Sequence, residues 1–158
     1  MLELKHSPLS VDSALALSSS GHAAEHVHQL DVLLSELCEE RGICSRHLTI
    51  RWGSVRRRAS RRRQRSICLG SYTMERSLIR IHPVLDNLWV PRFFVRYIIF
   101  HELLHHLIPT RIQGRRRICH GPEFRAHERA YPDYQRAQLW QQAFLPRLLR
   151  EATQLARS

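Results

Sequence analysis

The chain has 158 residues and 43% of them are hydrophobic, which suits one domain with a buried core. Its 25 Lys and Arg outnumber its 14 Asp and Glu, and the formal net charge of +11 favours an anionic partner such as nucleic acid. No apolar segment is long enough to cross a membrane, no secretory signal opens the chain and the four cysteines form no C-x-x-C pair, so we expect a cytoplasmic protein without a four-cysteine zinc site.

The N-terminal part is predicted to hold a flexible lead-in followed by one helix. Residues 1–21 end in a run of Ser and Gly, which is typical of a poorly ordered tail. In residues 22–41 apolar side chains recur at helical spacing, and Gly42 supplies a stop signal. The histidines near the start of this helix are interpreted as a solvated first turn, because no carboxylate or Cys completes a metal site with them: His22, His26 and His28.

Three short strands come next. Residues 47–52 alternate between apolar and polar side chains, which is typical of a strand with one buried face. Residues 67–72 and 78–82 are predicted as two further strands, joined by a hairpin turn at residues 73–76. We therefore expect an α+β domain in which a small three-stranded sheet packs on the helix at 22–41 and on the helix that follows the strands.

Arginine is concentrated in two runs. The first lies between the first two strands and the second lies further along: Arg56, Arg57, Arg58, Arg61, Arg62, Arg63 and Arg65, then Arg115, Arg116 and Arg117. Such runs stay solvated, and we interpret them as sites that bind the phosphates of nucleic acid without reading its sequence. A genomic preference for Arg is the alternative, since Lys5 is the only lysine, but that preference does not explain the excess over acidic residues.

The most apolar segment, residues 91–108, also contains the pattern H-E-x-x-H. Pro91 suits the first turn of a helix and Pro109 ends it, so the segment is predicted as a buried helix. Residues four apart share one face of a helix, so His101 and His105 could bind one Zn²⁺ ion. Glu102 then lies to one side, where it can accept a proton from a water on the metal.

A third ligand is needed, and the residues that follow offer several candidates. His106 lies on the side of Glu102, so we expect it to be near the site or in solvent. A loop places His120 just before Gly121-Pro122, where a helix at 122–130 is predicted to begin, and that loop could bring His120 back over the first helix. The other candidates in this stretch are Glu123, His127 and Glu128.

The chain is predicted to end in two helices. In the helix at 122–130, Phe124 is expected to pack inward, while Glu123, Arg125, Glu128 and Arg129 face water. Asp133 is a suitable N-cap for the last helix, which Pro146 is expected to bend or split. We assign residues 22–141 to one domain and residues 142–158 to a helical extension, whose apolar stripe is expected to pack on that domain.

His101-Glu102-x-x-His105 combined with His120-Gly121-Pro122-Glu123-Phe124 resembles the SprT-like family of minimal zinc metallopeptidases, whose eukaryotic member Spartan cleaves proteins crosslinked to DNA. Other pieces resemble the related YgjP-like metal-dependent hydrolases: Arg51-Trp52-Gly53-Ser54, Pro132-Asp133-Tyr134 and Trp140. The resemblance covers roughly residues 47–141. It implies a minimal zincin-type fold, with His101, His105 and His120 as ligands of one Zn²⁺ ion and Glu102 as general base.

The activity implied is hydrolysis of a peptide bond by a zinc-bound water. Tyr97, Tyr131 or an Arg could stabilise the oxyanion. An edge strand of the sheet could pair with the substrate backbone. Many SprT-like proteins also carry a four-cysteine zinc ribbon, which this chain lacks, since Cys38, Cys44, Cys68 and Cys119 are scattered.

Alternatives stay open at this point. The third ligand could be Glu123 or Glu128, as in thermolysin-like sites, whereas Cys119 is expected to point away from the metal. The protein could be a DNA-associated zinc module without peptidase activity, or a YgjP-like hydrolase of small phosphate-containing substrates. A carboxylate beside an open metal position favours an enzyme, because a structural zinc site uses four protein ligands. The signature P-C-x-x-C is absent, which disfavours a base deaminase.

Overall fold

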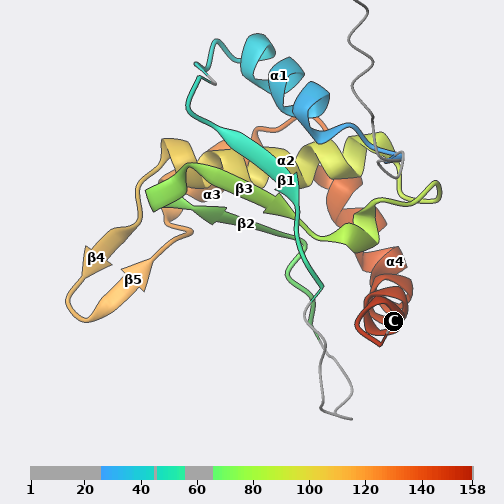
Figure 1. Cartoon of the computed structure of the whole chain (residues 1–158). Coiled ribbons are helices and arrows are strands. Elements are labelled where there is room, and N and C mark those ends of the chain that lie inside the picture. The colour runs from blue at the N-terminus through green and yellow to red at the C-terminus, as the bar shows by residue number, and fades with distance from the viewer. Residues whose placement is uncertain (1–25, 45, 56–65, 158) are drawn as a thin grey trace, which may run out of the picture.

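The computed structural model of the chain describes residues 26–44, 46–55 and 66–157 (Figure 1). Within these residues the chain forms an α+β arrangement of helices, one three-stranded sheet and one separate hairpin. The elements in chain order are α1 (Leu30–Glu40), β1 (Thr49–Trp52), β2 (Gly70–Thr73), the 3₁₀ helix η1 (Met74–Arg76), β3 (Leu78–Ile81), the 3₁₀ helix η2 (Pro83–Leu85), α2 (Arg92–Leu107), β4 (Arg111–Gln113), β5 (Arg116–Ile118), α3 (Pro122–Arg129) and α4 (Tyr134–Leu155). The predicted lead-in, His22 and the run from Arg56 to Arg65 lie outside the described residues.

The sheet has the strand order β1-β3-β2, so β3 is central. β1 runs parallel to β3, and β2 runs antiparallel to it with Gly70 opposite Ile81. The turn between β2 and β3 is the single turn of η1, which ends at Ser77 in a left-handed conformation with φ of 44°. The predicted three-stranded sheet is therefore confirmed, although β2 begins at Gly70 rather than at residue 67.

Helix α2 lies at the centre of the molecule, as its apolar circumference predicts. It contacts β2, β3 and each of the helices α1, α3 and α4 (Figure 1). Its buried side chains include Phe94, Val95, Ile99 and Leu103, all fully buried. Close packing of most of its surface fixes the position of the helix and limits the rotamers of the side chains that it buries. This rigidity matters for the H-E-x-x-H residues that α2 carries.

Helix α1 begins at Leu30 rather than at the predicted residue 22. The preceding residues form a bend at Asp86, whose carboxylate accepts hydrogen bonds from the backbone N–H groups of Val27 and His28. The ring of His26 pairs with the same carboxylate at 2.5 Å, and the buried ring of His28 bonds to the carbonyl of Val90 at 3.1 Å. The prediction of a solvated first turn is therefore wrong for the buried His28, whereas His26 is exposed as predicted but lies before the helix.

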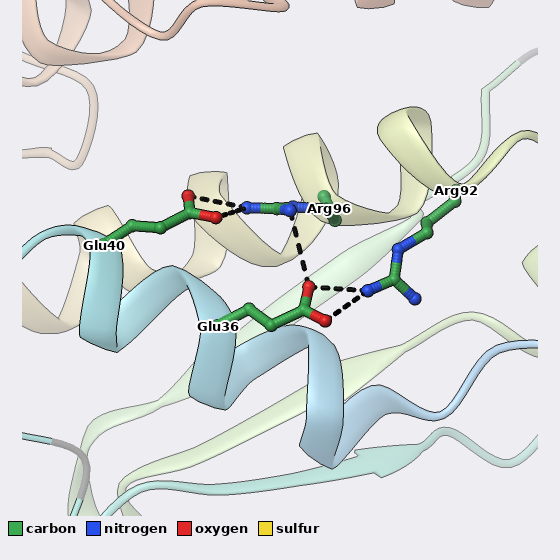
Figure 2. Close-up of polar contacts among 4 residues, drawn as sticks. All are labelled: Glu36, Glu40, Arg92 and Arg96. Atoms are coloured by element: carbon green, nitrogen blue, oxygen red, sulfur yellow. Dashed lines mark hydrogen bonds and ion pairs between the residues drawn. The ribbon is translucent and has the colours of Figure 1, made fainter.

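Figure 2 shows how α1 is fixed on α2 by ion pairs. Arg92 binds Glu36 at 2.5 and 2.6 Å, and Arg96 binds Glu40 at 2.7 Å while also reaching Glu36 at 3.4 Å. The pairs join residues four apart on both helices, so two rows of charge run side by side. Exposed pairs of this kind contribute at most about 1 kcal/mol each, so they fix the alignment of the helices while the buried apolar residues provide the stability.

Two further features differ from the predictions. The second Arg run lies in the hairpin β4–β5, which turns at Gly114 with φ of 60° and was not predicted, because its strands have only three residues each. Helix α4 continues through Pro146, so of the two predicted outcomes, a bend or a split, the split does not occur. Asp133 takes the N-cap position of α4, but its side chain makes no capping hydrogen bond. Leu148 and Ala152 are buried, so the C-terminal stripe packs on the rest of the chain as predicted.

The helices within the described part of the chain all lack the combination of length and apolarity that a membrane span requires.

Candidate metal centre

Helix α2 presents His101 and His105 on one face, one turn apart. Their ring centroids are 5.2 Å apart, and both side chains are half-buried. The hairpin β4–β5 then reverses the chain and returns it over α2 (Figure 1). The result is that His120, just before α3, meets the two helical histidines. His120 is 19 positions from His101 in sequence, and the hairpin accounts for the distance.

The three imidazoles converge through their Nε2 atoms. The Nε2 atom of His120 lies 3.2 Å from that of His101 and 3.0 Å from that of His105. Nitrogens bound to one tetrahedral zinc ion at the usual 2.0–2.1 Å would be about 3.3 Å apart, so the observed separations fit this ion. Among the described residues, these three histidines are the group of His, Cys, Asp and Glu that could hold a metal.

Hydrogen bonding alone does not account for this cluster. The Nδ1 atom of His101 lies 2.7 Å from the carboxylate of Glu128, which can only accept, so Nδ1 carries the proton and Nε2 of the neutral ring presents a lone pair. The Nε2 atom of His120 can donate at most one proton, yet it faces two imidazole nitrogens. These three nitrogens therefore cannot satisfy one another by hydrogen bonds alone, whereas one cation could accept a lone pair from each of them.

The pKa values of the cluster agree with metal binding. Burial, together with the charges that His101 and His120 would carry, lowers the pKa of His105 to about 4. The pKa of His120 is lowered for the same reasons, burial first and then the charge of His101. A metal ion binds the neutral form of imidazole, so these two ligands need not lose a proton to a metal near neutral pH.

Phe124 forms the apolar support beneath the three histidines. It is fully buried, and its ring centroid lies 5.1 Å from that of His101, 4.7 Å from that of His105 and 4.6 Å from that of His120. Contact with all three rings restricts their rotamers. Phe124 therefore holds the nitrogens in place even without an ion between them.

Glu128 is the residue of the centre that sequence reasoning assigned wrongly. It was expected to face water, but it accepts hydrogen bonds from His101 and, at 2.8 Å, from the hydroxyl of Tyr97, to which Gln138 donates in turn. Burial alone would raise the pKa of Glu128, but the hydrogen bonds from His101 and Tyr97 outweigh it and lower the pKa. The sequence contains a signal for the inward position of Glu128, because this residue lies four positions after Phe124 and so shares its inward face.

Glu102 is buried against the edge strand β2. Its side chain is next to Gly70, where an added Cβ atom would lie only 2.5 Å from the Oε1 atom of Glu102. Only glycine allows the strand to approach the carboxylate so closely. Burial raises the pKa of Glu102 to about 7, although a positive charge on His101 would oppose the rise. A carboxylate with this pKa can both accept and release a proton near neutral pH.

A second contact between β2 and α2 lies one step further along both elements. The Nδ1 atom of His106 is 2.7 Å from the hydroxyl of Tyr72, and both side chains are half-buried. Gly70 and Tyr72 are two residues apart on a strand, and Glu102 and His106 are four apart on a helix, which are both spacings of about 6–7 Å. The two elements therefore match in spacing, and β2 is fixed along the Glu102 side of α2.

The other candidate residues lie away from the imidazole cluster. Glu123 pairs with Arg111 on the surface, His127 is exposed, and the exposed thiol of Cys119 contacts the hydroxyl of Thr110. Two tyrosines were considered as groups that stabilise an oxyanion. The Tyr97 hydroxyl donates a hydrogen bond to Glu128, and the buried Tyr131 stacks on Phe100, with Arg41 over the Phe100 ring.

The basic runs are only partly described. Arg115 and Arg117 are exposed on the hairpin β4–β5, which Figure 1 shows projecting from the body of the molecule, and Arg116 lies in strand β5. The loop with Arg56, Arg57, Arg58, Arg61, Arg62, Arg63 and Arg65 is outside the described residues.

Comparison of this chain with protein families, with curated proteins and with solved structures finds no match.

Proposed function

We propose that this protein is a zinc-dependent metallopeptidase of the SprT-like type, with a minimal zincin-type fold. The observation that carries the proposal is the convergence of three imidazole nitrogens next to a buried carboxylate whose pKa is raised to about 7. Three protein ligands are the number that catalytic zinc sites use, because the fourth position is left for water or substrate. A purely structural zinc site would need a fourth protein ligand, and none of the described His, Cys, Asp and Glu residues joins the three.

The reaction follows from the protein groups around the cluster. Zinc, when bound, would polarise the substrate carbonyl and lower the pKa of water towards roughly 7. A carboxylate oxygen of Glu102 accepts a proton from the attacking water and then delivers it to the nitrogen of the leaving amine. Glu128 keeps the proton of His101 on Nδ1, so that Nε2 is free to act as a ligand.

The substrate backbone would bind along β2. This strand pairs with β3 on one side, and among the described strands it has no partner on the other. Gly70, at its start, is in contact with Glu102, so a peptide that pairs with the free edge would run past the general base. Strand addition of this kind supplies backbone hydrogen bonds independent of side-chain identity. That mode of binding suits an enzyme that cuts many proteins.

Nucleic acid is the partner that we propose beside the protein substrate. The exposed Arg115 and Arg117 lie on the hairpin that leads to His120, and the whole chain carries a net charge of +11. Contacts between Arg and phosphate would concentrate the enzyme on DNA without regard to sequence. The same arginines also favour the second candidate function, a hydrolase of small phosphate-containing substrates.

Hydrolysis of casein by the zinc-loaded protein tests the proposal. Wild-type protein should cleave casein, and Glu102→Gln should bind zinc equally well but lose cleavage. Glu39→Gln is the matched control, because that carboxylate is exposed on α1 and belongs to neither the imidazole cluster nor its surroundings. Adding single-stranded DNA measures whether nucleic acid stimulates cleavage. The proposal fails if zinc-loaded wild-type protein leaves casein and itself intact with and without DNA, or if Glu102→Gln retains activity.

A further inference from the structure

A cavity of about 500 Å³ lies beside the imidazole cluster. It is enclosed by the end of α2, the hairpin β4–β5 and the first turn of α3. Its apolar walls are formed by Ile108, Pro109, Ile112, Ile118, Pro122 and Phe124. Its size is that of a small-molecule or side-chain binding site, and Arg111, Cys119, Gly121 and Glu123 add polar groups to the lining.

The cavity adjoins the metal centre through two shared features. Phe124 contributes to its wall and contacts all three histidine rings. Cys119 and Gly121, the neighbours of His120 on both sides, also line it. The cavity therefore adjoins the metal centre through Phe124 and the neighbours of His120, although the three histidines and Glu102 do not line it themselves.

The hairpin adds exposed apolar surface where a folded protein would normally avoid it. The side chain of Ile112 lines the cavity and is nevertheless 76% exposed, and Leu107 nearby in sequence is 44% exposed. Such side chains lose contact with water when a ligand enters, which favours an apolar occupant.

One arginine lies beside the cavity without an acidic partner in its lining. Arg111 and Glu123 line the cavity and pair with each other at 2.8 Å, whereas the exposed Arg117, which is not a lining residue, lies directly opposite Ile112 in the hairpin register. The paired charges largely cancel, so Arg117 leaves an excess of positive charge beside the apolar walls. An acidic residue next to an apolar side chain complements this arrangement, whereas a basic residue would be repelled.

We propose that this cavity binds a large apolar side chain of the polypeptide substrate close to the scissile bond, and that Arg117 beside it favours an acidic neighbour. The inference rests on the proposed peptidase function and deepens it, because it names the sequence that the enzyme prefers. The centre would then select segments with an exposed Leu, Ile, Phe or Met beside Asp or Glu. Backbone pairing along β2 would supply binding without this selectivity.

The test measures binding rather than turnover. A short fluorescein-labelled peptide of Ala, Gly and Ser is compared with relatives that carry one Leu at successive central positions, using zinc-loaded Glu102→Gln protein. One relative should bind at least about 10-fold more tightly than the parent, since one methylene in an apolar pocket is worth about 10-fold or more. An Asp beside that Leu should tighten binding further at low salt, and a Lys should weaken it.

Ile112→Asp, in the same background, should remove the preference for Leu. Leu88→Asp is the matched control, because Leu88 is 88% exposed and does not line the cavity. Equal binding of all the peptides would overturn the inference, as would a Leu preference that survives Ile112→Asp in protein with normal zinc content. If single-stranded DNA displaces every peptide equally and no peptide shows a Leu preference, the surface around the cavity binds nucleic acid instead of an apolar side chain. A Leu preference without casein cleavage by wild-type protein would support the pocket and refute the peptidase.

Discussion

Replacing Glu128 by Gln tests whether the metal centre depends on the hydrogen bond behind His101. The substitution keeps the size of the side chain but removes its charge, and its amide could donate as well as accept. The Glu128 side chain is only 16% exposed, so water does not readily replace the carboxylate. His101 would then be free to adopt the tautomer with its proton on Nε2, which cannot bind a metal.

The loss of zinc affinity expected for Glu128→Gln can be given a magnitude. Removing a carboxylate that orients a histidine ligand typically weakens metal binding about 10- to 100-fold, which corresponds to about 1.4–2.7 kcal/mol. At saturating zinc the same free energy is lost from the metal-induced stabilisation of the fold. For a chain of this size the zinc-induced rise in Tm should be smaller by about 3–11 °C.

Competition with a fluorescent chelator gives the zinc Kd, and thermal unfolding with and without zinc gives the change in Tm. Glu123→Gln is the control, since Glu123 lies on the same helix and is 52% exposed. If Glu128→Gln and Glu123→Gln bind zinc with the same Kd as wild-type protein, the hydrogen bond does not orient His101 for a metal, and that part of the reasoning is refuted.

Three further predictions concern the groups around Glu102. Gly70→Ala should cost about 1–3 kcal/mol of stability and reduce kcat about 100-fold, because the new Cβ atom displaces Glu102, the proposed general base. Gly53→Ala, with its nearest contact at 3.4 Å, should leave kcat unchanged, and equal kcat values for the two variants would contradict the close packing. In metal-free protein the ionised form of Glu102 destabilises the fold, because burial raises its pKa from 4.5 to about 7. In denaturant unfolding, Glu102→Gln should therefore raise the free energy of unfolding by about 3 kcal/mol above pH 7 and leave it unchanged below pH 4.5. A gain in stability that does not change with pH would refute the raised pKa. Tyr72→Phe should lower the free energy of unfolding by about 1 kcal/mol, since it removes the hydroxyl that contacts His106. In a double-mutant cycle the same substitution should cost nothing in protein that already carries His106→Phe. An equal cost in both backgrounds would contradict the contact.

The parts of the fold that could be predicted are those specified by local pattern. The apolar circumference of residues 91–108 and the prolines at its ends predict α2 to within one residue, and the alternation around Ile50 predicts β1. The spacing of His101, Glu102 and His105 fixes their relative positions, because helix geometry alone determines it. These features require no knowledge of the rest of the chain.

The remaining features depend on partners that are distant in sequence. Helix α1 starts late because Asp86 binds the residues before it, and Glu128 turns inward because His101 and Tyr97 lie opposite. The hairpin β4–β5 has three-residue strands rich in Arg, which resemble a solvated loop in sequence. It is nevertheless this hairpin that returns His120 to α2 and forms one wall of the cavity.

X-ray absorption of the zinc-loaded protein tests the central claim most directly. The account predicts one zinc ion per chain bound by three imidazole nitrogens at about 2.0–2.1 Å and by one oxygen from outside the protein. In His120→Ala protein one imidazole should be missing from the spectrum. A sulfur ligand, a fourth ligand from the protein, or a spectrum that His120→Ala leaves unchanged would contradict a three-histidine site with an open position beside Glu102.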